Sequence, residues 1–258
     1  MKKVLAMLLI AVMMLSLAAC GGNSEAKGDV AAIQEAGKLV VGITVYEPMN
    51  YKDADGEWTG FDTEFAQAVA EKLGVEAEFV TIDWDNKWAT LDSKKIDCVW
   101  NGMTLTEEAK TNASCTDAYV LNAQVVVMKA DKVADYADAA SMKDLKFAVE
   151  AGSAGKEIAA ENSFNVTEYA TQTDAMSAIA AGKADACIID ITMAKAMTGD
   201  GTSFADLGIG ISLTEEEYAI ACRKDSDLTA KINELMYTLT ADGTLPALAE
   251  KYSLTLAE

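Results

Sequence analysis

The sequence contains no histidine, and this absence removes several kinds of chemistry. Nucleophilic sites that use histidine, zinc sites with histidine ligands and imidazole general bases are all excluded. Positive charge is also scarce, with 21 Lys and Arg residues against 41 Asp and Glu residues and a formal net charge of -20. Because nucleic-acid binding depends on clustered Lys and Arg side chains, no nucleic-acid partner is expected. Enzymatic chemistry would have to use carboxylates, Lys, Tyr or Cys.

The length and composition predict an ordinary folded protein. A chain of 258 residues can form one large domain or two lobes of roughly 100 residues each. Hydrophobic residues make up 51% of the chain and charged residues 24%, which is unlike a disordered or low-complexity sequence. A sizeable hydrophobic core is therefore expected.

The five cysteines include no CxxC pair, which disfavours a metal site. Apart from Cys20 they are Cys98, Cys115, Cys187 and Cys222. Three of these four lie in short apolar runs, where a free thiol is buried as a small hydrophobic side chain. One disulfide among the four is the alternative, and the sequence does not choose the pairing.

Residues 1–19 have the pattern of a signal peptide. Lys2 and Lys3 precede an apolar run that is short for a membrane span, which needs roughly 20 apolar residues. Residues 17–20, Leu-Ala-Ala-Cys, resemble the lipobox of bacterial lipoproteins, in which the cysteine carries the lipid. We therefore expect a lipid anchor at Cys20, a tether over residues 20–36, and a location outside the cytoplasmic membrane, in a periplasm or at a cell surface.

From residue 38 onward, short apolar strands alternate with amphipathic helices, which is typical of α/β layers. Asp55-Gly56 is expected to form a hairpin turn, and Asp62 to be the N-cap of a helix that ends at Gly74. A second block from residue 146 repeats the order of the first, which predicts two similar lobes. Strands are expected at residues 39–43, 76–82, 97–102, 146–150, 166–169, 186–189, 208–213 and 218–222, and helices at 62–73, 87–93, 174–181 and 227–242.

Short motifs occur in a fixed order at residues 46–49, 60–65, 102–106, 117–119, 152–153, 182–186 and 242–244. Together they resemble family 3 of the bacterial solute-binding proteins, the polar amino acid receptors of ABC importers. The resemblance implies an α/β, two-lobed periplasmic binding protein type II fold. It places residues 37–121 plus 215–258 in lobe 1 and residues 122–214 in lobe 2, with two hinge strands joining the lobes.

The same resemblance implies a function. The protein is expected to bind a polar amino acid in the interlobe cleft, and closure of the lobes to make the complex recognisable to the permease subunits of an ABC transporter. A monomer without a cofactor or a metal site is expected. The competing interpretation is an enzyme on the same scaffold, because Glu150 and Asp190 could serve as acid and base, as in related dehydratases.

In lobe 1, the resemblance implies binding residues at four positions, with Asn101 beside them. Tyr46 and Trp84 are expected to be aromatic walls against the ligand side chain, with core packing as the alternative. The carbonyl of Gly102 and the hydroxyl of Thr104 are expected to accept hydrogen bonds from the ligand ammonium.

In lobe 2, Asp190 matches the family's carboxylate that pairs with the ligand ammonium. Ser153 and Ala154 lie where a glycine loop enters a helix, so their N–H groups are expected to hold the ligand carboxylate. Glu150 lies at a position that commonly lines the pocket, and it adds a second negative charge.

One departure from the family pattern leaves two kinds of ligand open. The family usually has an arginine three residues after Thr106, where it binds the ligand carboxylate, and this sequence has Ala109. Lys87 is the first candidate to replace it, and Lys110 the second. Two hypotheses follow: a zwitterionic amino acid bound with the help of Lys87 or the helix N-terminus, or a cationic, amine-rich solute bound by Glu150 and Asp190. The match of Asp190 and the glycine loop favours the first.

Overall fold

The computed structural model describes residues 28–258. The expected signal peptide (residues 1–19), the lipidation at Cys20 and most of the tether lie outside the described residues. None of the helices in the described part of the chain is both long enough and apolar enough to cross a membrane.

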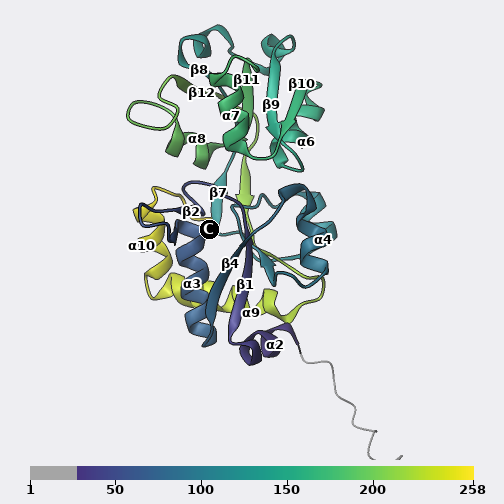
Figure 1. The fold of residues 1–258 in the computed structure, drawn as a ribbon, viewed down its shortest axis with the longest axis vertical. Coiled ribbons are helices and arrows are strands. Elements are labelled where there is room, and N and C mark those ends of the chain that lie inside the picture. The colour runs from purple at the N-terminus through teal and green to yellow at the C-terminus, as the bar shows by residue number, and fades with distance from the viewer. Residues whose placement is uncertain (1–27) are drawn as a thin grey trace, which may run out of the picture.

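The first five-stranded sheet has the order β4-β1-β5-β14-β6. β1 (Lys38–Ile43) pairs in parallel with β4 (Glu76–Thr81) and with β5 (Cys98–Val99). β14 (Ala221–Cys222) pairs antiparallel with β5 and with β6 (Ser114–Cys115). The first sheet is therefore built from both ends of the chain, and it forms the core of lobe 1, the lower lobe in Figure 1.

The second sheet has the order β10-β9-β11-β8-β12 and belongs to lobe 2. β9 (Lys146–Glu150) pairs in parallel with β10 (Asn165–Tyr169) and β11 (Ala186–Asp190). β8 (Gln124–Lys129) pairs antiparallel with β11 and with β12 (Leu207–Ser212). Both sheets thus have two parallel pairings followed by two antiparallel ones, so the repeated sequence pattern does correspond to two similar lobes.

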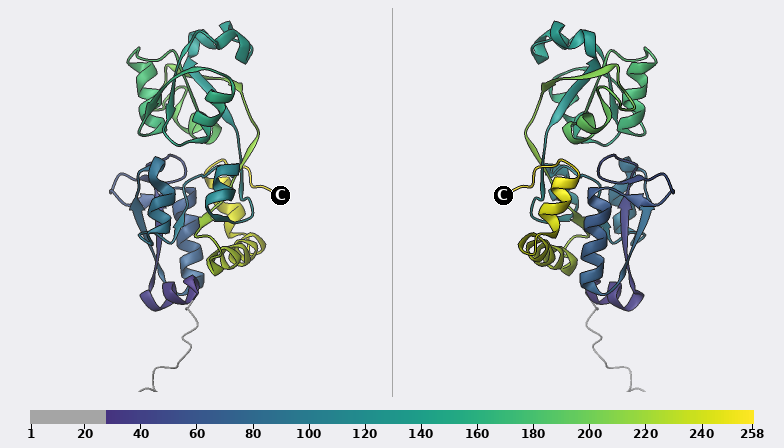
Figure 2. Two further views of the ribbon diagram at one scale, coloured as in Figure 1. Left: turned by 90° about the vertical axis from the view of Figure 1, so that its right-hand side faces the viewer. Right: turned by 90° about the vertical axis from the view of Figure 1, so that its left-hand side faces the viewer.

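Two strands run between the lobes. β7 (Val120–Asn122) and β13 (Glu216–Tyr218) pair antiparallel, and the side views show the chain passing between the lobes along one side of the molecule (Figure 2). The expected lobe boundaries, 121/122 and 214/215, fall in or beside these strands and remain a prediction.

Helices pack on both sheets, and the apolar spacing in the sequence explains which faces are buried. In the longest of them, α9 (Asp227–Ala241), the buried residues include Leu228, Ile232, Leu235 and Leu239, as the spacing predicts. The other helices of lobe 1 are α2 (Asp29–Ala36), α3 (Phe61–Leu73), α4 (Lys87–Asp92), α5 (Glu107–Asn112) and α10 (Thr244–Lys251), with the short helix η1 (Trp84–Asn86) and the hairpin β2 (Tyr51–Lys52) and β3 (Trp58–Thr59). Those of lobe 2 are α6 (Ala154–Glu161), α7 (Gln172–Ala180), α8 (Ile191–Met197), η2 (Ala130–Asp135) and η3 (Ala139–Met142).

The expectation that Asp62 caps a helix is wrong. Gly60 is the N-cap of α3, and Asp62 lies inside the first turn with 1% of its surface exposed. Its carboxylate accepts hydrogen bonds from the N–H of Gly102 and, at 2.8 Å, from the hydroxyl of Tyr119. Burial raises the pKa of Asp62 to about 7. Asp62 therefore joins α3 to the loop that carries Gly102.

The strand expected at residues 97–102 is shorter in the structure, where β5 ends at Val99. Gly102 has φ 53°, a left-handed conformation that cannot continue a strand. The side-chain oxygen of Asn101 accepts from the N–H of Thr44 at 2.8 Å, so a side chain replaces the ladder hydrogen bond. The strand ends where the chain turns toward the space between the lobes.

All four cysteines in the described part of the chain are free. Cys98, Cys187 and Cys222 are buried, and burial raises the pKa of each thiol. A buried thiol with a raised pKa is a poor nucleophile. The structure therefore agrees with the interpretation of these residues as small hydrophobic side chains.

Candidate functional site

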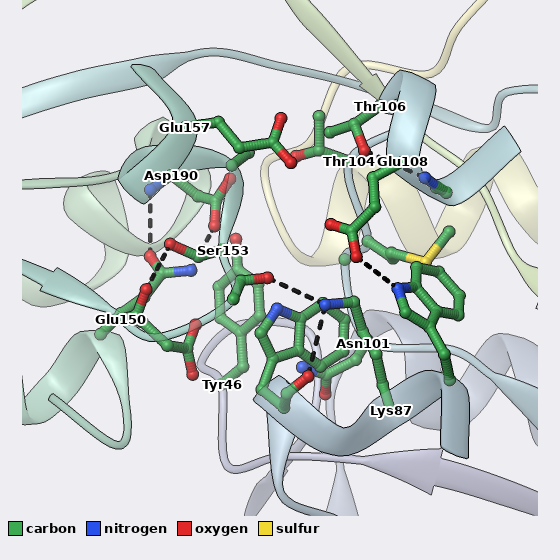
Figure 3. A pocket seen from close by; sticks show the side chains of 18 residues that line it. Tyr46, Lys87, Asn101, Thr104, Thr106, Glu108, Glu150, Ser153, Glu157 and Asp190 are labelled. Atoms are coloured by element: carbon green, nitrogen blue, oxygen red, sulfur yellow. Dashed lines mark hydrogen bonds between the residues drawn. The ribbon is translucent and has the colours of Figure 1, made fainter. Parts of the chain in front are cut away.

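A single cavity between the lobes is bordered by all ten residues predicted to bind ligand. Lobe 1 contributes Tyr46, Trp84, Lys87, Asn101, Gly102 and Thr104 (Figure 3). Lobe 2 contributes Glu150, Ser153, Ala154 and Asp190. The cavity has a volume of about 30 Å³ in this conformation. That volume holds a few water molecules at most. The structure thus has the lobes close together, and contact of these residues with a ligand remains a prediction.

Asp190 is a buried carboxylate at the end of β11, with 4% of its surface exposed. One of its oxygens accepts hydrogen bonds from the side-chain amides of Asn122 and Gln124, and the other from that of Gln172. Burial, together with the charge of Glu216, raises the pKa of Asp190 to about 6. The amides hold the carboxylate in one orientation, so the position at which an ammonium would pair with it is fixed.

Glu150 is the second buried carboxylate of the cavity. It ends β9 and has 5% of its surface exposed. Burial, and then the charge of Asp190, raises the pKa of Glu150 to about 8, while the charge of Lys87 acts in the opposite direction. A further positive charge between the two acids would favour the ionised form of both.

Lys87 is buried at the start of α4, with 4% of its surface exposed. Its Nζ donates to the carbonyl oxygens of Gly152, at 2.8 Å, and Trp84, at 3.3 Å. The ammonium also lies 4.8 Å and 5.0 Å from the ring centroids of Trp84 and Trp88, within cation–π range. Burial lowers the pKa of Lys87. Since Gly152 belongs to lobe 2, this lysine joins the two lobes.

The polar groups of Asn101 are used within lobe 1. Its Oδ1 accepts from Asn50 as well as from Thr44, and its Nδ2 donates to the hydroxyl of Thr44 at 2.7 Å. The hydroxyl of Thr104 donates to Glu216 at 3.1 Å, which leaves its oxygen free to accept another hydrogen bond. Asn101 therefore fixes the loop, while the role of Thr104 as an acceptor for the ligand ammonium remains a prediction.

Tyr46 forms one wall of the cavity and a second link between the lobes. It has 3% of its surface exposed. Its hydroxyl pairs with the hydroxyl of Thr192 in α8 at 2.6 Å and with that of Tyr218 in β13 at 2.5 Å. These bonds fix the orientation of the ring.

The N-terminus of α6 faces the cavity through Ser153 and Ala154. Ser153 is the N-cap, and its Oγ accepts from the N–H of Lys156 at 3.2 Å. Glu157, in the first turn, also lines the cavity. Burial, and then the charge of Glu108 from lobe 1, raises the pKa of Glu157. The helix end that was expected to hold a ligand carboxylate therefore has a carboxylate of its own nearby.

No guanidinium replaces the one missing at Ala109. That residue is buried in α5, and Lys110 is exposed, bonded to Glu107 at 2.8 Å and absent from the residues that line the cavity. The single arginine of the chain, Arg223, donates to Asp29, Asp97 and the carbonyl of Ile96, and it too is absent from the cavity lining. Among the residues that line the cavity, Lys87 is the one cation.

The model of the family described as bacterial extracellular solute-binding proteins, family 3, matches residues 39–255. The chain belongs to this family. The expected resemblance is thereby confirmed, over nearly the whole of the described chain.

Two relatives show how similar this solute-binding protein is to named members of the family. It is 33% identical to the arginine-binding extracellular protein ArtP of Bacillus subtilis over 98% of both chains. It is 31% identical to the L-cystine-binding protein TcyJ of Escherichia coli over 85% of this chain and 84% of that one.

Solved structures confirm the two-lobed fold. An amino acid ABC transporter substrate-binding protein from Streptococcus pneumoniae, bound to L-arginine, superposes with a TM-score of 0.80 at 27% identity, over 90% of this chain and 100% of that one. An ancestral amino acid-binding protein, a precursor of cyclohexadienyl dehydratase, also has a TM-score of 0.80, at 29% identity over 87% and 99% of the two chains. This family member therefore has the architecture of the amino-acid-binding proteins.

Five polar or aromatic residues of the cavity in this solute-binding protein were not predicted to bind ligand from its sequence. They are Trp88, Thr106, Glu108, Glu157 and Gln172. Thr106 ends the motif at residues 102–106. A spacing of four residues is the signal for two of the others, because Trp88 lies four residues after Trp84 and Glu157 four residues after Ser153. Glu108 and Gln172 carry no local signal, since their place at the cavity depends on how the lobes meet.

Proposed function

We propose that this protein captures a positively charged solute of the amino-acid class in the interlobe cavity and presents it to the permease of an ABC importer. The balance of charge at the cavity carries this proposal. Four carboxylates line it, against the single ammonium of Lys87; they are Glu108, Glu150, Glu157 and Asp190. Because Coulomb interactions are strong where water is excluded, such a cavity favours a cation over a neutral zwitterion.

The ligand ammonium is proposed to pair with Asp190. Amide donors already orient this carboxylate, so an ammonium gains a charge-assisted bond without reorganisation of the protein. The zwitterion hypothesis depends on Lys87, whose ammonium already donates to two carbonyl oxygens. The arginine-binding relative and the arginine-bound structure are consistent with a cationic ligand.

Binding without turnover is part of the proposal. The named relatives are binding proteins, and the likeness to a dehydratase precursor supports the enzyme only as the second candidate. Glu150 and Asp190 are the acid–base pair that such an enzyme would use. Recovery of the bound compound unchanged and in stoichiometric amount would support the receptor.

The protein is proposed to act outside the cytoplasmic membrane as a monomer without a cofactor. The family is described as extracellular. The signal-peptide pattern of residues 1–19 and the lipobox ending at Cys20 support export and a lipid anchor. The anchor would keep the receptor near its permease.

The proposed function is tested by identifying the solute. Native mass spectrometry of the purified protein, followed by calorimetry with the compound found, is expected to give a cationic amino acid or amine. Asp190→Asn should weaken its binding by about tenfold to a hundredfold, the worth of a charge-assisted hydrogen bond.

The matched control is Asp131→Asn, which makes the same change at an exposed residue of η2 and should leave the affinity unchanged. A co-purified sugar or metal chelate, or an Asp190→Asn variant with full affinity, would contradict the proposal.

A further inference from the structure

A second, larger cavity adjoins the one described above. It is a groove of about 930 Å³ between α5, the two hinge strands and α6. Thr104, Thr106, Ala154 and Glu157 line both cavities. The two cavities are therefore neighbours, and a solute held at Asp190 would reach the groove past these shared residues.

The groove is far more acidic than the chain as a whole. Six of its 15 lining residues are glutamates, compared with 41 acidic residues among the 258 of the whole sequence. Lys110 is the one cation of the lining, and it is bonded to Glu107. Like charges at this density repel one another and attract cations into the space that they share. The glutamates are Glu107, Glu157, Glu161, Glu215, Glu216 and Glu217.

Asn122 provides a second, independent sign of a ligand with N–H groups. It lines the groove with 6% of its surface exposed. Its Nδ2 donates to Asp190 and to Glu216, two acceptors that fix which end of the amide carries the hydrogens. Its Oδ1 is buried and has no hydrogen-bond partner within residues 28–258. A buried acceptor without a donor is costly, and an ammonium would supply the donor.

The two cavities are also linked by shared hydrogen bonds. The amides of Asn122 and Gln124 each donate to Asp190 and to Glu216. Glu216 lies in β13, so the carboxylate of the first cavity and that of the groove are held as neighbours by the hinge region. Two neighbouring carboxylates held in place in this way suit a solute with more than one ammonium group.

The residues that line the groove favour an organic cation over a metal ion as the ligand. The described residues contain no group of three or more His, Cys, Asp or Glu side chains placed to hold a metal ion. Leu105, Leu121 and Ile158 lie among the glutamates of the lining. A lining that contains both carboxylates and apolar side chains matches a chain of methylene groups that carries several amines.

We propose that the groove is an extension of the binding site, and that the solute is an extended cation of the amino-acid class that carries several amine groups, with one ammonium at Asp190 and the others beyond Glu157. This inference rests on the proposed function, since it takes Asp190 as the first anchor. It adds a second subsite and a requirement for ligand length.

A ligand series tests the proposal by calorimetry on the full-length chain at an ionic strength of about 0.15 M. The probes are 1,4-diaminobutane, spermidine and spermine, with lysine and arginine for comparison. Spermidine should bind about tenfold more tightly than 1,4-diaminobutane, because its third ammonium gains a charge-assisted contact in the groove. Affinity that does not rise with the number of amines would overturn the proposal.

Variants then show which residues cause the tighter binding of spermidine. The double variant Glu161→Gln and Glu215→Gln should remove most of the advantage of spermidine and leave the affinity for 1,4-diaminobutane unchanged. The matched control is Glu234→Gln with Glu250→Gln, which makes the same change of charge at exposed residues of α9 and α10. An equal loss in both double variants would mean that net charge alone attracts the amine, and would also overturn the proposal.

The two proposals fail in different ways. If lysine or arginine binds and Asp190→Asn abolishes that binding, while chain length brings no gain, the extension is wrong and the receptor function stands. If no amino acid or amine binds, or if Asp190→Asn changes nothing, the proposed function fails and the extension fails with it.

Discussion

At the scale of single residues, the positive charge of Lys87 affects how strongly the cavity binds a charged ligand. Its ammonium lies between two tryptophan rings and donates to carbonyls of both lobes. A lysine held in this way has one N–H left for a ligand, and its positive charge opposes the entry of a cation.

We expect Lys87→Met to strengthen the binding of a cationic ligand by about threefold or more, because a like charge is removed from a site with little water. Calorimetry with arginine, or with the solute found in the native protein, measures this. Lys156→Met is the control, since Lys156 pairs with Glu168 on the surface of lobe 2. A weakening of about tenfold would show instead that Lys87 holds a ligand carboxylate, as in the zwitterion hypothesis.

The sequence predicted ten of the residues that line the cavity, because most of them belong to short motifs. Asp190 ends a strand and Ser153 follows one, and the end of a strand faces the cleft in such folds. It did not find Glu108, whose neighbour Ala109 points into the core of lobe 1. The pattern could show that an arginine is missing there, but it could not show which acids would surround that position.

At the scale of elements, two helix starts differ from the expected ones, whereas α4 and α9 begin at Lys87 and Asp227 as predicted. Helices were expected to begin at Asp62, because aspartate is a good N-cap, and at Asp174. The caps are Gly60 and Thr171, and Asp174 lies in the first turn of α7, where its N–H donates to Thr171. Aspartate also favours the first turn, so composition alone does not separate the two positions.

The backbone at Gly60, the N-cap of α3, leads to a specific prediction about stability. Its φ is 116°, and a Cβ there would lie 2.3 Å from the backbone oxygen of Met49. Gly182→Ala should lower the free energy of unfolding by about 1–2 kcal/mol, because alanine is strained in a left-handed backbone conformation. Gly60→Ala should lower it by at least twice as much.

Gly182 is the matched control, because it has φ 69° and a methyl group added there would have nothing within 4 Å. Urea unfolding of the two variants measures the difference. Equal losses of stability would mean that the contact with Met49 relaxes, so that only backbone strain remains.

At the scale of the whole molecule, three buried carboxyl groups link stability to pH. The pKa is raised from 4.5 to about 8 for Glu150, from 3.8 to about 7 for Asp62 and from 3.8 to about 6 for Asp190, in each case chiefly by burial. The folded state thus binds protons more tightly than the unfolded state. Its stability is highest below the unfolded pKa values and is lost as the pH rises through the folded ones.

We therefore expect the ligand-free protein to be more stable at pH 5.5 than at pH 8, by about 1 kcal/mol or more. Urea unfolding across this range measures the slope. Glu150→Gln removes the group with the highest of the three pKa values, so its stability should change less between pH 6 and pH 8. Stability that rises with pH, or an unchanged slope in the variant, would contradict this prediction.

The sequence by itself determined the family, the two-lobed topology and the identity of ten cavity residues. These features depend on local periodicity and on short motifs, which can be recognised without knowing how the lobes contact each other. The contacts between lobes were decided by the tertiary structure alone. The bond from Lys87 to Gly152 and the approach of Glu108 to Glu157 join segments that are distant in sequence, and so does the groove beyond them. Their charges act on one another only because folding excludes water from the space between them.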